Sequence, residues 1–300
     1  MSNQFAFRDT SDWPLQPTSR QGSVHSSLSS PSDTTSIHFA TPNFPPTPAL
    51  SGRSDPGRPS NNGPEHNVHV PLTKPVHISF SKGSKLFKLK YAQVQLRRDV
   101  AGHLKRIELS DPAGLQSTFV HSFPGTKLPI PHLEQPVTSS STHISRISFL
   151  EEQNVQTAQT LFQAQPSYTF ETWEDCVHFQ EALLSQTVIF TAGIAEAKSK
   201  GRGEECISQN LRILRSRTGA QVILFFANSQ RKEKKRYISV PLDCIDRIEQ
   251  SKKAGRPMSL SLRPNFDLLA QLRALHITFL DDNDQKRFSG LLINGIGFQG

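Results

Sequence analysis

Side chains of the same type recur after 109 positions in the second half of this chain. The matched pairs are Thr169 and Thr278, Phe170 and Phe279, Asp175 and Asp284, Phe179 and Phe288, and Leu183 and Leu292. A looser similarity links residues 131–135 with residues 247–250. Solenoid repeats are typically about 20–50 residues long. The longer period therefore predicts two copies of one domain fold.

Each copy is predicted to close with a helix. In the first copy Thr172 is a candidate N-cap, and Asp175 completes a capping-box-like pair at the positive end of the helix. An apolar stripe follows at helical spacing, through Val177, Phe179 and residues 182–184. The second helix is expected from Asp281 to about Asn294, with Asp281 as its cap.

Short β-rich runs fill the rest of both copies, separated by Gly, Pro and Ser. In the first copy we expect strand alternation over residues 86–97, with Leu86, Tyr91, Val94 and Leu96 as its apolar members. This strand pairs with residues 104–109 across a turn near Ala101-Gly102. Four further runs cover residues 117–123, 128–133, 143–150 and 160–170. The seven strands of the second copy are expected at residues 188–195, 206–215, 221–226, 236–240, 244–248, 258–262 and 275–280. The chain is therefore predicted to be mainly β with C-terminal helices, each copy being a small barrel or sandwich.

Residues 1–75 differ from the rest in composition. They hold 12 of the 21 prolines and 13 serines, and five basic side chains balance five acidic ones. Such a segment buries too little apolar surface to offset its chain entropy, so we predict a disordered tail. It serves either as a spacer or as a docking tail. Ser30-Pro31, Thr41-Pro42 and Thr47-Pro48 are candidate phosphorylation sites, and residues 42–45 and 45–48 have the PxxP spacing that proline-motif readers recognise.

The second copy resembles the pleckstrin-homology (PH) family. Its segment Tyr237–Ile245 is similar to the middle strands of PH domains, and seven strands closed by one helix match their element order. The family's helical Trp is replaced by Phe179 in one copy and Phe288 in the other. The resemblance covers residues 77–300 and implies two PH-like domains, at 77–187 and 188–300. Independent β-sandwiches are the structural alternative.

The positive charge is concentrated in the second copy. Residues 77–187 carry ten basic and ten acidic side chains, whereas residues 188–300 carry 19 and 11. The candidate anion-binding residues are Lys198, Lys200, Arg202, Arg231, Lys232, Lys234, Lys235 and Arg236, with a secondary cluster of Lys82, Lys85, Lys88 and Lys90. The first three resemble the phosphoinositide-binding basic pattern of PH domains, although Glu204 and Glu205 follow directly.

Three interpretations of these clusters remain open. They form a solvated surface that keeps the protein soluble, a face that docks on anionic lipid, or, for residues 231–236, a nuclear import signal. Nucleic-acid binding is disfavoured because only Tyr237 flanks that run as a stacking aromatic. We expect a non-enzymatic adaptor or scaffold that binds anionic membrane lipid or protein partners, cytoplasmic or peripheral to a membrane. The alternative is a nuclear protein whose tandem PH-like domains bind histone or other chromatin partners.

No motif points to an enzyme, a cofactor or a metal. The GxGxxG at residues 295–300 has no helix after it in this sequence, so we interpret it as a chance match. His66 and His69 lack the further local ligands that a metal site needs. Cys176 and His178 point in different directions on a helix, which disfavours a Cys–His nucleophile. A helix cap explains Asp281, Asp282 and Asp284 without a bound cation. Cys176, Cys206 and Cys244 are odd in number, which favours a reducing compartment. No apolar run approaches the length of a membrane span, and the first residues do not resemble a secretory signal.

Overall fold

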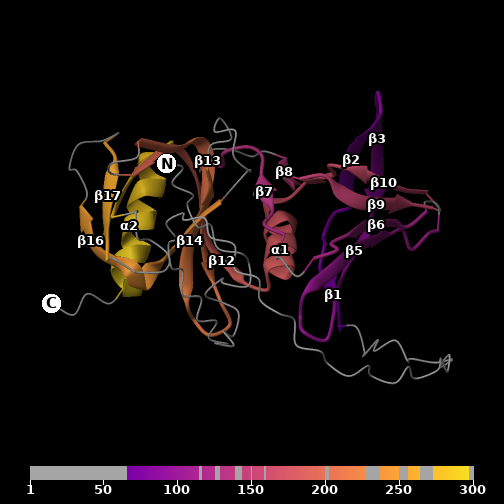
Figure 1. Ribbon diagram of the computed structural model, residues 1–300, viewed down its shortest axis with the longest axis horizontal. Coiled ribbons are helices and arrows are strands. Elements are labelled where there is room, and N and C mark those ends of the chain that lie inside the picture. Colours follow the sequence, from indigo (N-terminus) through magenta and orange to yellow (C-terminus); the bar gives the residue numbers. More distant parts are fainter. Residues whose placement is uncertain are drawn as a thin grey trace, which may run out of the picture. The chain divides into compact units, whose positions relative to one another are not determined.

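The computed structural model describes residues 66–114, 117–125, 129–138, 144–149, 151–158, 160–199, 203–227, 237–249, 256–263 and 273–296. All of them belong to one compact unit. This part of the chain is mainly β, with two α-helices of which the second is close to the C-terminus (Figure 1). Residues 1–65, which include most of the predicted tail, lie outside the described residues.

The first half contains eleven described strands, more than its six predicted β-rich runs or the seven strands that the PH-like resemblance implies. They are β1 (His66–Val70), β2 (Val76–Lys82), β3 (Lys85–Tyr91), β4 (Gln93–Arg98), β5 (Leu104–Ser110), β6 (Phe119–Ser122), β7 (His132–Leu133), β8 (Ser145–Ser148), β9 (Gln153–Thr157), β10 (Thr160–Ala164) and β11 (Ser167–Phe170). They form a six-stranded sheet in the order β1-β4-β5-β6-β9-β10 and a five-stranded sheet in the order β3-β2-β11-β8-β7. Every pairing is antiparallel, and one aromatic-rich core contains the inward side chains of both sheets.

Three predictions for this half need correction. His66–Val70 was assigned to the disordered tail, but it forms β1, pairs with β4 and buries Val70 completely. The single strand expected over residues 86–97 is two strands in different sheets, β3 and β4, and residues 160–170 also form two strands. The predicted pairing of residues 104–109 across the turn near Ala101 is confirmed, because β4 pairs with β5.

The described residues of the second half form the seven strands that its sequence predicts. They are β12 (Thr187–Ser199), β13 (Gly203–Arg215), β14 (Gln221–Phe226), β15 (Tyr237–Pro241), β16 (Ile245–Glu249), β17 (Met258–Leu262) and β18 (Ala274–Phe279), with a 3₁₀ turn at Leu242–Cys244. They make one antiparallel sheet in the order β15-β14-β13-β12-β18-β17-β16. The long β12 pairs with both β13 and β18, and its register shifts allow the strand to bend between them.

Both helices begin where their caps predict. The Thr172 hydroxyl accepts a hydrogen bond from the Asp175 amide at 3.2 Å, and α1 runs over Trp173–Leu184. The Asp281 carboxylate accepts from the Asn283 amide at 2.8 Å, and α2 runs over Asp282–Ile296. Each side chain satisfies an amide that the first helical turn leaves without a backbone partner.

The matched positions of the repeat make equivalent contacts. Phe170 packs on Phe179 with ring centroids 5.2 Å apart, and Phe279 packs on Phe288 at the same distance. The strands correspond as well, since the β2–β3 hairpin lies beside β11 as the β12–β13 hairpin lies beside β18. The two halves therefore share a strand-and-helix arrangement around their closing helices.

The first half also packs against the outer face of β13 and β14. Leu214, Val222, Leu224 and Phe226 belong to the core of the first half, whereas Ile213 and Ile223 on the same strands face the core of the second half. Apart from Glu174, the residues of α1 are buried or half-buried. Residues 210–214 of β13 and residues 222–226 of β14 are thus buried on both faces, and they complete the packing around α1.

Asn210 on β13 ties this contact to the segment around β7. Its amide nitrogen donates to the carbonyl oxygens of Leu133 and Gln135, and its amide oxygen accepts from the Val137 amide at 2.8 Å. One side chain therefore satisfies three backbone groups that the contact would otherwise bury without partners.

Candidate functional site: a cationic and apolar hairpin

The β2–β3 hairpin extends beyond its neighbouring strands at the edge of the five-stranded sheet (Figure 1). Its two-residue turn is Gly83-Ser84, between the paired residues Lys82 and Lys85. Gly83 has a φ of +60°, a left-handed conformation that glycine adopts without steric cost. The turn thus brings two lysines together at the tip of an outer hairpin.

Lysines along this hairpin surround exposed apolar side chains. Lys82, Lys85 and Lys88 are exposed, and among the described residues no carboxylate lies within ion-pair distance of them. Between them Leu86 is 61% exposed and Phe87 is 38% exposed. We call these five residues the β2–β3 tip.

An aromatic cluster supports the tip from below. The Phe80 ring stacks on Phe87 at a centroid distance of 5.3 Å and also packs against Phe162 of β10 at 5.4 Å. The ammonium group of Lys82 lies 4.6 Å from the centroid of the Phe162 ring. Since β3 and β10 are edge strands of the two sheets, the cluster closes an open edge of the sandwich. Leu161, beside Phe162, is 65% exposed.

The outward position of Leu86 corrects the sequence interpretation, which placed it in the apolar face with Tyr91. Side chains alternate along a strand, so Leu86 shares a face with Lys88 and Lys90, whereas Phe87 shares one with Tyr91. Tyr91 is 1% exposed and Leu86 is 61% exposed. The sequence contains this signal, because Leu86 and Tyr91 are five residues apart. An odd separation places two side chains on opposite faces of a strand.

Lys90, the fourth predicted member of this cluster, lies away from the turn. It pairs in register with His77 of β2, and His77 Nε2 is 3.1 Å from the Glu171 carboxylate. An acidic side chain, Glu171 directly after β11, therefore lies beside the base of the hairpin, whereas the tip contains only cationic and apolar side chains.

The predicted anion site of the second half is described at one position only. Lys198 lies near the end of β12, half exposed, with its Nζ 2.6 Å from the Glu196 carboxylate. Lys200, Arg202, Arg231, Lys232, Lys234, Lys235 and Arg236 lie outside the described residues. Glu196, two positions before Lys198 on the same strand face, was not considered in the sequence analysis.

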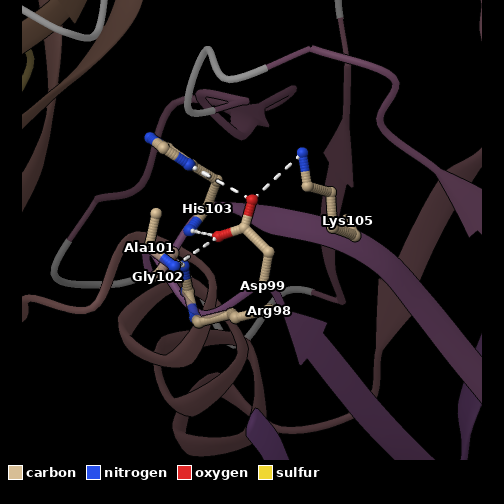
Figure 2. Close-up of polar contacts among 6 residues, drawn as sticks. All are labelled: Arg98, Asp99, Ala101, Gly102, His103 and Lys105. Carbon is tan, nitrogen blue, oxygen red and sulfur yellow. Dashed lines mark hydrogen bonds and ion pairs between the residues drawn. The ribbon is translucent and has the colours of Figure 1, made fainter. Parts of the chain in front are cut away.

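A second polar cluster occupies the β4–β5 turn (Figure 2). One Asp99 carboxylate oxygen accepts from the amides of Ala101 and His103, and the other is 3.2 Å from Lys105 Nζ and 3.3 Å from His103 Nδ1. Partial burial acts to raise the pKa of Asp99, but these hydrogen bonds hold it below its usual value. All these partners of Asp99 belong to the turn or to the start of β5, so the cluster stabilises the β4–β5 hairpin.

Arg98, beside this turn, is directed to the end of α1. Its guanidinium donates to the carbonyl oxygens of Ala182 and Leu183 at 2.8 Å and to that of Gly102 at 3.0 Å. A buried cation at this position satisfies helix carbonyls that lack backbone partners and complements the negative end of the helix dipole. Its role is therefore structural.

Cys176 and Asp284, two of the groups considered for catalysis or metal binding, are buried on the two helices. Cys176 is fully buried on α1, and burial raises the pKa of its thiol to about 12, which disfavours the nucleophilic thiolate. Asp284 is buried and accepts from Arg287 at 3.0 Å, and burial raises the pKa of its carboxyl. The described residues contain no group of three metal-ligating side chains.

Arg212 of β13 lies in the contact between the two halves and is 1% exposed. Its guanidinium donates to Gln180 Oε1 and to the Pro131 carbonyl oxygen, both at 2.8 Å, and burial lowers its pKa to about 10. These acceptors are uncharged, so the buried charge is held by neutral hydrogen bonds. Sequence analysis counted Arg212 only as one of the basic residues of the second half.

Comparison with known proteins assigns no family. No protein-family model matches the chain, and no curated protein matches it. Among the described residues, no helix is long and apolar enough to cross a membrane.

Proposed function

We propose that the protein is a non-enzymatic adaptor that docks on anionic lipid surfaces, with the β2–β3 tip as a point of contact. The observation that carries this proposal is the group Lys82, Lys85 and Lys88, whose charges are unpaired among the described residues. Some other cations are matched, as Lys105 is by Asp99 and Lys198 by Glu196. Each basic residue near an anionic leaflet contributes about 1 kcal/mol.

The strand arrangement supports a PH-like assignment for this adaptor. In the second half seven antiparallel strands are followed by a helix, and the order β15-β14-β13-β12-β18-β17-β16 places the first strand beside the last. The first half repeats the hairpin, the closing strand and the helix, with further strands added. A cytoplasmic, peripheral location is part of this proposal.

Edge protection is the structural alternative for the lysines. Lysines on an outer strand prevent its open edge from pairing with another chain, and β3 is such a strand. This explanation requires no ligand and predicts no affinity for lipid. It leaves the exposed Leu86 and Phe87 unexplained, because apolar side chains on an open edge favour association.

The test is co-sedimentation of the full chain with vesicles containing phosphatidylserine and phosphoinositide, at low and at 0.5 M salt. The variant K82A/K85A/K88A is expected to lose most of the pelleted fraction at low salt. The matched control R247A/R263A/K286A removes three exposed cations from the second half and is expected to retain binding. A K198A/K200A/R202A variant tests the predicted second-half site in the same assay.

Two results would overturn this assignment. Equal losses in the hairpin variant and in the control would mean that a diffuse positive charge accounts for binding. A wild-type protein that fails to pellet with any lipid would refute membrane docking and favour a protein partner for the tip.

A further inference from the structure

The β2–β3 tip combines two properties within a few residues. It has exposed cations on strands that carry no acidic side chain, and it has exposed apolar side chains between those cations. Val100 is also apolar and is 73% exposed, but it lies in the β4–β5 turn beside Asp99. A lysine cluster alone binds at the level of the lipid headgroups. An apolar side chain contributes binding free energy only if it is buried below them.

We infer that Leu86 and Phe87 insert into the boundary between the headgroups and acyl chains of an anionic bilayer. This inference rests on the proposed function and adds a depth of binding to it. Lys82, Lys85 and Lys88 match the negative charge of that leaflet. The hairpin projects from the sheet (Figure 1) and residues 81–88 are exposed. A fluid bilayer accommodates such a convex tip without a preformed pocket.

Contacts with the aromatic cluster hold the side chains of the tip in the positions from which they would enter the bilayer. Phe87 is held against Phe80, so its ring stays in place on the edge of the sandwich while part of it is open to solvent. Lys82 is held over Phe162. Leu86, opposite Ser81 in register, has its side chain on the outer face of the same hairpin. Leu86 is therefore the first apolar side chain after the turn that a bilayer can cover without any change in the fold.

Insertion predicts that binding has a salt-resistant part. Salt screens the contribution of the lysines, whereas burial of apolar surface persists at high ionic strength. We expect L86S to bind vesicles about tenfold more weakly than wild type at 0.5 M salt, since burial of a leucine is worth about this factor or more. V100S, at an exposed apolar position away from the tip, is expected to bind as wild type does.

A depth measurement tests the inference directly. An environment-sensitive fluorophore is attached at L86C in the full chain, with V100C as the matched control. The native cysteines Cys176, Cys206 and Cys244 are buried and do not compete in the folded protein. With anionic vesicles, the label at position 86 is expected to shift to the blue and to be quenched by lipids that carry a nitroxide on the upper acyl chain. The label at position 100 is expected to do neither.

The outcomes separate the two proposals. Pelleting with no spectral shift at position 86 and no effect of L86S overturns insertion and leaves headgroup docking in place. An absence of pelleting by the unlabelled wild-type chain overturns docking, and insertion with it. Equal quenching at positions 86 and 100 also overturns the inference, because it would place the β4–β5 turn at the same depth.

Discussion

His121 is expected to make the folded state sensitive to mild acid. Its imidazole is fully buried on β6, with Nδ1 2.8 Å from the Tyr168 hydroxyl and with Phe123 and Phe149 against the ring. Its Nε2 is buried without a hydrogen-bond partner. Burial lowers the pKa of His121 to about 3, because a charged imidazole loses its hydration there.

The size of the effect follows from proton linkage. The unfolded chain binds a proton at His121 below an ordinary pKa of about 6.5, whereas the folded chain does not until far lower pH. Stability is therefore highest above pH 6.5 and falls as the pH decreases toward 3. Between pH 7.5 and pH 5.0 this single group removes about 2 kcal/mol from the free energy of unfolding.

Urea unfolding at several pH values between 5.0 and 7.5 measures this loss. H121Q keeps a polar side chain that does not titrate, so the stability difference between the two pH values should shrink by about 2 kcal/mol in that variant. H69Q removes an exposed imidazole from β1 and serves as the control. If H121Q and wild type lose the same stability between these pH values, the buried imidazole is not the source of the acid sensitivity.

Three further predictions concern side chains that connect elements, each measured by urea unfolding. R212A leaves two buried acceptors without donors, at about 1–3 kcal/mol each, and should destabilise the fold by roughly 2–6 kcal/mol, whereas R247A at an exposed site should cost about 0.5 kcal/mol or less. D175A removes the acceptor for the Thr73 amide and hydroxyl and the Lys74 amide, and should cost about 3 kcal/mol at pH 7. Burial acts to raise the pKa of Asp175, but these hydrogen bonds lower it overall. The difference in unfolding free energy between wild type and D175A should therefore shrink as the pH falls below about 4. F288A should cost about 3–5 kcal/mol by opening a cavity against Phe279 and Phe190, and a loss below about 1 kcal/mol would contradict that packing.

The sequence predicted the second half more completely than the first because its signals are local. Its apolar runs are long, its turns are marked, and α2 begins at an acidic cap, so β14 and β17 have the predicted bounds. In the first half the strands are shorter and change sheets. Nothing within residues 86–97 indicates that β3 and β4 belong to different sheets, because that division depends on pairing with β2, β1 and β5.

The contact between the halves was not predictable from periodicity alone. The run Gln221–Phe226 has apolar side chains at five consecutive positions, which is consistent with a strand buried on both faces. The sequence does not say what covers its second face. That covering is the first half with α1, and the same contact explains how a charged residue such as Arg212 is fully buried.

The candidate site illustrates why the net charge of a domain differs from the charge that is left without an ion pair on its surface. The first half is neutral, which directed attention to the second half, with its net charge of +8. Yet acidic side chains of the first half are paired within it, as Glu108 is with Arg97 and Arg106, and Asp99 with Lys105. Charges screened over about 8–10 Å act locally. A neutral domain can therefore present an unpaired cationic tip, and a ligand responds to the field at that tip more than to the total charge of the chain.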